Sequence, residues 1–220
     1  MEDIKANLEQ IRAQLKPGVQ LIAVTKTHSP MEINVAIDNG VTDIGENKVQ
    51  EILDKYDSVK PVRWHMIGHL QTNKVKYIID KVCLIHSVDS LKLAKEIDKR
   101  AEQHDLTMDI LIQVNSAEDE NKFGISSDET GELIHDILDQ CPHVRIRGLM
   151  CIAPFAENPE DVRPFFAEVK KQYDEFGRIR NDRLDFKYLS MGMSHDFMAA
   201  QEEGSNMVRV GTAIFGSRVY

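Results

Sequence analysis

A lysine stands at the end of a short apolar segment, where it could form a covalent bond with an aldehyde. Residues 21–26 read Leu-Ile-Ala-Val-Thr-Lys, and the Thr-His-Ser-Pro that follows ends this β-like run. Ligands of α/β proteins bind at the carboxyl ends of buried parallel strands. Partial burial lowers the pKa of a lysine, and a neutral amine forms an imine with an aldehyde. Lys26 is therefore a candidate site residue; the alternative is a structural lysine that covers a strand end.

Two turns late in the chain have the composition of a phosphate site. Residues 190–194 read Ser-Met-Gly-Met-Ser, and Gly211-Thr212 forms the second turn. Gly192 permits close backbone approach, and Ser194 is placed to cap the helix that follows. Backbone N–H groups in such turns bind phosphate, and barrels often hold it at their last two loops. Ser190, Gly192, Ser194, Gly211 and Thr212 are candidates, although serine and glycine also occur in ordinary tight turns.

Arg209 lies between these turns in the sequence and completes a possible ligand site. An amine, an arginine and two phosphate-binding turns suit a ligand with an aldehyde at one end and a phosphate at the other, joined through an aromatic ring. Pyridoxal 5′-phosphate (PLP) is such a molecule. An arginine beside its pyridine nitrogen would keep that nitrogen unprotonated and weaken the ring as an electron sink.

Eight β-like segments alternate with helical patterns along the whole chain. Ile4, Leu8, Ile11 and Leu15 recur at helical spacing, which predicts an extra helix before the first strand. Eight β/α units in one chain favour a closed (β/α)₈ TIM barrel over the alternative, a doubly wound open sheet. No linker interrupts the pattern, so we expect residues 1–220 to form a single PLP-binding domain. The predicted strands are residues 21–26, 43–47, 63–68, 82–86, 108–114, 144–150, 186–190 and 207–211.

Composition excludes several classes of protein. The chain has 220 residues, no apolar run of about 18 residues and no signal-peptide pattern at its start, so we expect neither a membrane span nor export. A net charge of −9 argues against general nucleic-acid binding. Three widely spaced cysteines fit reduced thiols in the cytoplasm. His65 and His69 are four residues apart, but they span a strand and a turn, and we expect no metal site.

Six segments, in order, resemble the pyridoxal phosphate homeostasis protein family (YggS/PROSC-type), from about residue 21 to the C-terminus. Single segments would be weak signals, whereas six in register are highly specific. They are residues 23–26 (AVTK), 45–47 (GEN), 65–74 (HMIGHLQTNK), 147–150 (RGLM), 189–194 (LSMGMS) and 208–216 (VRVGTAIFG).

The resemblance implies a single-domain barrel related to the N-terminal domain of alanine racemase. It implies PLP held as an imine on the strand-one lysine, which matches Lys26, and an arginine by the ring nitrogen, which matches Arg209. It also places Asn47 and His65 on the side of the pocket. The implied phosphate site matches Ser190, Gly192, Ser194, Gly211 and Thr212.

The resemblance also carries an expectation about activity. It favours a protein that stores, buffers or delivers PLP over an enzyme. We expect a monomer, with PLP-dependent apo-enzymes as candidate recipients. The alternative is weak racemase-like activity on amino acids, which needs an acid/base group on each face of the imine carbon. In alanine racemase the second base is a tyrosine on a further domain, and this chain ends at Tyr220. One departure from the family pattern is Asp119, which replaces a glutamate in the loop after the fifth strand.

Overall fold

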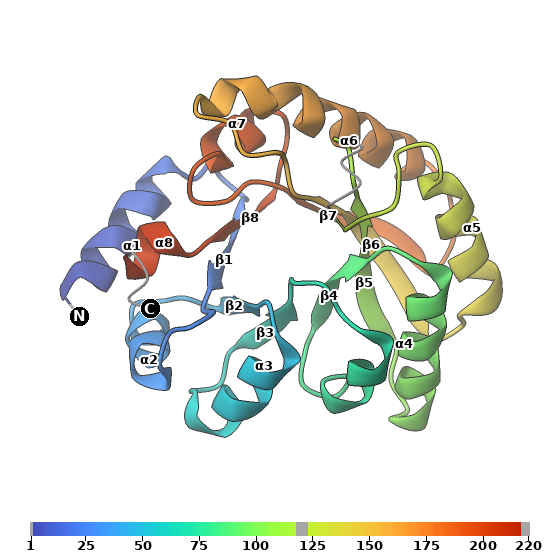
Figure 1. Cartoon of the computed structure of the whole chain (residues 1–220), viewed down its shortest axis with the longest axis horizontal. Coiled ribbons are helices and arrows are strands. Elements are labelled where there is room, and N and C mark those ends of the chain that lie inside the picture. Colours follow the sequence, from blue (N-terminus) through green and yellow to red (C-terminus); the bar gives the residue numbers. More distant parts are fainter. Residues whose placement is uncertain (1, 118–122, 217–220) are drawn as a thin grey trace.

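The strands close into a parallel barrel in the computed structural model, which describes residues 2–117 and 123–216 (Figure 1). Each strand pairs with the next, and β8 pairs with β1 in the register Gln20↔Met207 to Ala23↔Val210. The prediction of a (β/α)₈ barrel is confirmed, and the open sheet is excluded. The strands are β1 (Gln20–Val24), β2 (Asp43–Glu46), β3 (Arg63–Met66), β4 (Leu84–Val88), β5 (Met108–Val114), β6 (Val144–Cys151), β7 (Leu184–Ser190) and β8 (Met207–Val210).

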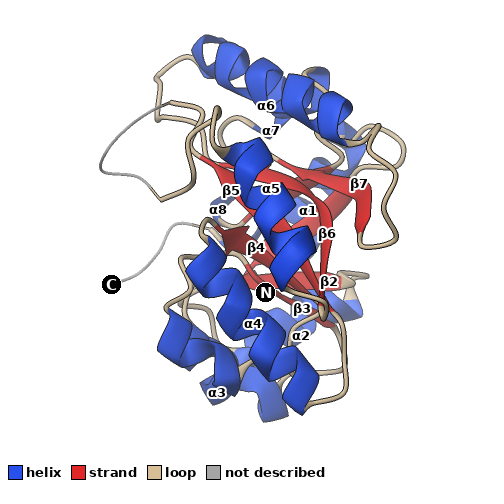
Figure 2. Cartoon of the chain, turned by 90° about the vertical axis from the view of Figure 1, so that its right-hand side faces the viewer, coloured by secondary structure: helices blue, strands red, loops and turns tan. Residues whose placement is uncertain are grey.

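Helices surround the strands on the outside of the barrel (Figures 1 and 2). The expected extra helix is α1 (Glu2–Gln14), which lies beside the last helix, α8 (Thr212–Phe215). Within the described ranges, no helix is both long and apolar enough to cross a bilayer. The remaining helices are α2 (Pro30–Asp38), α3 (Val49–Lys55), α4 (Leu91–Gln103), α5 (Thr130–Gln140), α6 (Arg163–Phe176) and α7 (Phe197–Glu202), with 3₁₀ turns at Tyr56–Ser58, Thr72–Tyr77 and Pro159–Val162.

The apolar core has an outer layer and an inner layer. The outer layer fills the space between strands and helices and contains most of the buried aliphatic side chains. The inner cluster lies inside the barrel and is small: Ile22, Leu84, Leu111, Met150 and Met207, with Tyr188 packed against it. The interior also contains buried polar side chains, which are described below.

Strand and helix ends differ from the prediction at the places that matter for the site. β1 ends at Val24, so Lys26 lies in the following loop rather than in the strand. Residues 72–77, between β3 and β4, form a 3₁₀ helix. The short α8, which begins directly after Gly211, was not predicted, because four residues are too few to show a helical period.

The loop after Lys26 ends in a strongly capped helix. Ser29 is the N-cap of α2, Glu32 completes a capping box with it, and Pro30 occupies the first turn. Gly40, with a φ of +84°, follows the C-cap in the left-handed conformation that glycine adopts readily. The capping box and Pro30 therefore fix where the loop that carries Lys26 ends and α2 begins.

Candidate functional site

One cavity opens among the loops that follow β1, β7 and β8, where the barrel closes. Its volume is about 190 Å³, below the range of about 300–1,000 Å³ typical for drug-sized ligands. Among the described residues, those that line it include Lys26 and Arg209 and no carboxylate, although the whole chain has a net charge of −9. The cavity therefore suits a small anion. Its lining is Val24, Lys26, His28, Met193, Ser194, His195, Arg209, Gly211 and Thr212.

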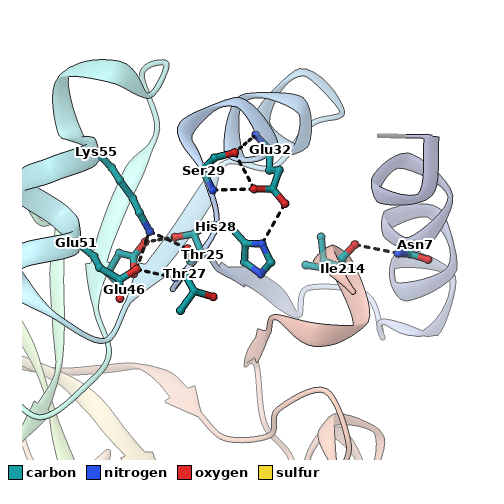
Figure 3. A network of polar contacts seen from close by, with 10 residues as sticks. All are labelled: Asn7, Thr25, Thr27, His28, Ser29, Glu32, Glu46, Glu51, Lys55 and Ile214. Atoms are coloured by element: carbon teal, nitrogen blue, oxygen red, sulfur yellow. Dashed lines mark hydrogen bonds and ion pairs between the residues drawn. The ribbon is translucent and has the colours of Figure 1, made fainter. Parts of the chain in front are cut away.

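Side chains of α3 hold the backbone on both sides of Lys26 (Figure 3). Lys55 Nζ donates to the carbonyl oxygen of Thr25 at 3.0 Å, and the backbone N–H of Thr27 donates to Glu51 Oε2 at 2.6 Å. Thr27 has a φ of +69°, a conformation that is strained for a β-branched residue. The contacts with α3 thus stabilise a strained turn directly after Lys26.

Glu46 completes this cluster from the end of β2 (Figure 3). Its side chain is fully buried, and its Oε1 accepts hydrogen bonds from Lys55 Nζ at 2.8 Å and from Thr25 Oγ1 at 2.7 Å. Oε2 has no hydrogen-bond partner among the described residues. Burial raises the pKa of Glu46, while the bonds from Lys55 and Thr25 act in the opposite direction. The buried ion pair joins β1, β2 and α3 beneath the lysine.

His28 lines the cavity two residues after Lys26, and we did not single it out from the sequence. Its ring stacks on Phe215 of α8, with centroids 4.5 Å apart, and its Nδ1 lies 3.3 Å from Glu32 Oε1. These contacts hold the imidazole at the edge of the cavity. The available signal was its spacing from Lys26, but the turn at Thr27 made the direction of the side chain unreadable.

Arg209 extends from β8 and lies buried at the cavity, 3% exposed. Its NH1 donates to both the carbonyl oxygen and the Oγ of Ser190, each at 2.7 Å, and its NH2 donates to the Cys151 carbonyl oxygen at 2.8 Å. Burial lowers the pKa of Arg209, but a guanidinium remains charged in proteins. The Cys151 thiol is fully buried, and burial raises its pKa to about 12, so we expect it to be unreactive.

Ser194 joins the two turns that were predicted to hold phosphate. Its Oγ accepts hydrogen bonds from the backbone N–H groups of Gly211 at 3.2 Å and Ala213 at 3.4 Å. The prediction that Ser194 caps the next helix along the chain is wrong, because Asp196 is the N-cap of α7. The serine instead binds the first turn of α8. An oxygen of a bound phosphate could replace the serine oxygen as the acceptor of these N–H groups.

Ser190 and Gly192 lie beneath the cavity rather than in its lining. Ser190 is fully buried at the end of β7 and accepts from Arg209. Gly192 has a φ of +92°, and a Cβ on it would lie 2.7 Å from Ala200 Cβ. Glycine is thus required there for packing against α7.

The structure does not place His65 and Asn47 in the cavity lining. His65 points into the barrel and is 2% exposed; its Nδ1 lies 3.0 Å from His86 Nε2 and its Nε2 lies 2.9 Å from Asp43 Oδ1. It lies within β3, and the side chains that line the cavity do not include it. Asn47 follows β2 and is half-buried, and its carbonyl oxygen would lie 2.3 Å from a Cβ on Gly68.

His65 and His69 have separate surroundings. The ring of His69 stacks on Phe123 with centroids 3.8 Å apart, away from the partners of His65. Over the part of the chain that the structure describes, no group of three or more His, Cys, Asp or Glu side chains could hold a metal ion. Asp119, where the family pattern is broken, lies outside the described residues.

Comparison with known proteins identifies the family. The model of the alanine racemase N-terminal domain matches residues 1–219. A pyridoxal phosphate homeostasis protein of Aquifex aeolicus is 47% identical over 203 residues, which cover 91% of this chain and 88% of the relative. The chain belongs to the pyridoxal phosphate homeostasis protein family. The family member from Escherichia coli is 36% identical over 236 residues, covering 100% of this chain and 99% of the relative.

Solved structures place this family member in the same fold. PipY of Synechococcus elongatus without PLP superposes with a TM-score of 0.89 at 36% identity, over 97% of this chain and 100% of that chain. A structure of PipY with PLP bound gives a TM-score of 0.85 at 35% identity. Alanine racemase of Clostridium difficile has a TM-score of 0.76 at 15% identity, which shows a shared fold alone.

Proposed function

We propose that this chain binds PLP in the cavity at the mouth of the barrel and serves PLP homeostasis by storing, buffering or delivering the cofactor. The observation that carries the proposal is the cavity itself, in which a lysine, an arginine and the joined turns of Ser194 and Gly211 meet without a carboxylate among its described lining residues. The structure of PipY with PLP bound supports it from a relative.

The cavity residues have distinct roles in this proposal. Lys26 holds PLP as an imine, so that its amine supplies the covalent attachment. Arg209 faces the ring nitrogen and keeps it unprotonated, which limits the electron-sink chemistry that the cofactor otherwise supplies. Ser194, Gly211 and Thr212 bind the phosphate.

Two candidates from the sequence act indirectly in the proposal. Ser190 positions Arg209 through the hydrogen bond to its Oγ, and Gly192 shapes the turn before Ser194. Asn47 and His65 support the loops and the barrel interior rather than contact the ligand.

We further propose that the protein is not an enzyme. Its curated relatives carry the name of homeostasis proteins. The alternative is weak racemase-like activity. Two observations favour testing it: the shared fold with alanine racemase, and the imidazoles of His28 and His195 in the cavity lining. Cα–H exchange of alanine in deuterium oxide distinguishes them, because a racemase-like exchange rate would overturn the non-enzymatic proposal.

The proposal extends to the state of the molecule in the cell. We propose that residues 1–220 form a single PLP-binding domain that acts as a monomer in the cytoplasm, with PLP-dependent apo-enzymes as possible recipients. The three cysteines are free thiols in the structure, which is compatible with a reducing compartment.

A titration with PLP tests the proposed binding. The purified protein is expected to gain the absorbance band of a protein-bound imine, with an endpoint of one PLP per chain. A spectrum that remains the sum of free PLP and protein would contradict the proposal. Lys92→Ala, a change on the exposed face of α4, is the matched control and should titrate like the parent protein.

A further inference from the structure

A continuous chain of hydrogen bonds runs from the cavity through the interior of the barrel. Its members are Arg209 (β8), Ser190 (β7), His86 (β4), His65 (β3) and Asp43 (β2), and we call them the barrel chain. The links are Arg209 NH1 to Ser190 Oγ at 2.7 Å, Ser190 Oγ to His86 Nδ1 at 3.1 Å, His86 Nε2 to His65 Nδ1 at 3.0 Å and His65 Nε2 to Asp43 Oδ1 at 2.9 Å. Each side chain is at most 3% exposed. Aliphatic side chains usually fill this volume in such barrels.

The chemistry of its two ends gives the barrel chain one direction. Arg209 can only donate, so Ser190 Oγ accepts from it. An ionised Asp43 can only accept, so a neutral His65 donates to it from Nε2; Nδ1 of each neutral ring is then an acceptor, and Ser190 Oγ donates to His86 Nδ1. His86 then carries its hydrogen on Nε2 and donates to His65 Nδ1. His65 likewise carries its hydrogen on Nε2 and donates to Asp43, which accepts. Every hydrogen therefore points from the arginine toward the aspartate.

The surroundings of the far end favour the same direction. Asp43 Oδ1 also accepts from Gln20 Nε2 at 2.8 Å and from Arg63 Nε at 2.7 Å. Cys83 Sγ lies 3.5 Å from His65 Nε2, which is longer than the bond to Asp43. Burial opposes ionisation of Asp43, but its hydrogen bonds prevail and lower its pKa, so it stays a carboxylate at neutral pH.

Both histidines remain neutral in this environment. Burial is the largest cause that lowers the pKa of His65 and of His86, and for His86 the charge of Arg209 acts in the same direction. A neutral imidazole has one donor and one acceptor nitrogen. Each neutral ring can accept a hydrogen bond at Nδ1 and donate one from Nε2, which keeps all the bonds in one direction. A protonated ring donates from both nitrogens and would interrupt the series.

We propose that Asp43, His65 and His86 are positioning residues, which hold the Arg209 guanidinium beside the ligand cavity by fixing the direction of the barrel chain. If the chain reversed, His86 and Arg209 would both donate to Ser190 Oγ, so the arginine would share this acceptor and the serine hydrogen would have no acceptor in the chain. This inference rests on the proposed function only for its effect on PLP binding. It links Arg209 at the cavity to a carboxylate at the first residue of β2.

Histidine tautomers measured by ¹⁵N NMR in the PLP-free protein at neutral pH test the direction. We expect both His65 and His86 to carry their hydrogen on Nε2. Hydrogen on Nδ1 of His86 would overturn the inference, and because no PLP is present, it would leave the proposed function untouched. Conversely, a protein with these tautomers that binds no PLP would refute the proposed function alone.

A pair of substitutions at Asp43 tests the coupling over distance. Asp43→Asn keeps an acceptor oxygen for His65 and should retain the tautomers and most of the PLP affinity. Asp43→Leu removes the acceptor and should move the hydrogen of His86 to Nδ1, shift the absorbance band of bound PLP and weaken binding about tenfold, the effect of one lost bond to a charged group. Equal PLP spectra and affinities for the two variants would overturn the coupling.

Two further variants separate this effect from misfolding. Asp109→Leu removes a different inward-facing carboxylate, one paired with Arg145 and outside the barrel chain; it should leave the tautomers and the PLP spectrum unchanged. Should Asp43→Leu fail to fold, Ser190→Ala cuts the chain beside Arg209 and should weaken PLP binding about tenfold as well. An unaltered affinity and band in Ser190→Ala would count against the inference.

Discussion

Lys26, in the loop after β1, and Arg209, in β8, line one cavity, because β8 pairs with β1 where the barrel closes. The two side chains are held differently. The backbone around the lysine is fixed by contacts from α3, whereas the head group of the arginine is fixed by Ser190 and Cys151. Both groups are therefore held in place before a ligand binds: the Lys26 amine by its fixed loop and the Arg209 guanidinium by its hydrogen bonds.

Replacing Lys26 separates covalent from non-covalent binding. Lys26→Ala should lose the imine absorbance band and bind PLP roughly tenfold more weakly or worse, a loss of about 1.4 kcal/mol. Some affinity should remain, because the phosphate turns are intact. An absorbance titration measures both effects. An unchanged imine band in this variant would assign the attachment to another lysine.

Replacing Arg209 tests whether the cavity needs a planar guanidinium, whose two terminal nitrogens bind different partners. In Arg209→Lys the charge persists, but one ammonium cannot reproduce the planar fork that spans Ser190 and Cys151. We expect the free energy of unfolding in urea to fall by about 1–3 kcal/mol. Arg145→Lys, at a half-exposed ion pair, is the control and should change it by less than about 1 kcal/mol. Similar losses in both variants would argue against a special role for the buried fork.

At the scale of elements, α3 and the loop after β1 behave as one unit (Figure 3). The first strand stops at Val24, and the chain then makes the strained turn at Thr27 before α2 begins at its capping box. That turn depends on Glu51 and Lys55 in α3, far along the chain, and not on local sequence preference. The cap of α2 is a local feature, whereas this dependence joins α3 to the loop after β1 and could not be seen in the sequence.

Breaking the ion pair beneath the loop should destabilise the protein strongly. Lys55→Met leaves the buried carboxylate of Glu46 without its cation, and removing one partner of a buried pair costs about 3–5 kcal/mol. Urea unfolding measures the loss. Adding Glu46→Gln to Lys55→Met should restore part of the stability, since the uncompensated charge is then gone.

A surface pair provides the matched comparison for this experiment. Lys60 and Asp38 form an ion pair in which both side chains are about half exposed, and Lys60→Met should change stability by no more than about 1 kcal/mol. If Lys55→Met were no more harmful than Lys60→Met, the proposed role of α3 in holding the Lys26 loop would have to be abandoned.

For the whole molecule, the barrel was readable from the sequence because its signal is repeated eight times. Each strand has a short apolar run, and each helix has apolar residues at helical spacing. An error in the predicted end of one element therefore did not change the predicted fold. The interior was not readable in this way. His86 and Ser190 are 104 residues apart in sequence yet share a hydrogen bond, and only the closure of the barrel brings them together. For the same reason the sequence could not show that His65 is hydrogen-bonded to His86 and Asp43.

The neutral histidines of the barrel chain predict a pH dependence of stability. A histidine whose folded pKa lies below its unfolded value binds fewer protons when folded, so stability falls as the pH drops below about 6.5. Each histidine contributes a slope of up to about 1.4 kcal/mol per pH unit. Glu46, whose folded pKa is raised, acts with the opposite sign from about pH 4.5 upward. Its contribution is the same in the parent protein and in a histidine variant, so it cancels in their comparison.

Urea unfolding between pH 5 and 7 measures this dependence. In His86→Gln the contribution of one histidine is removed, and the loss of stability on acidification should be correspondingly smaller than in the parent protein. Parallel stability curves for the two proteins would show that His86 does not remain neutral in the folded state.

The attachment of PLP to Lys26 is the central claim, and borohydride reduction tests it most directly. Reduction of the protein–PLP complex, followed by proteolysis and mass spectrometry, locates the amine that carries the cofactor. The account predicts one modified peptide, the one that contains Lys26. Modification at any other lysine instead, or none at all, would contradict it.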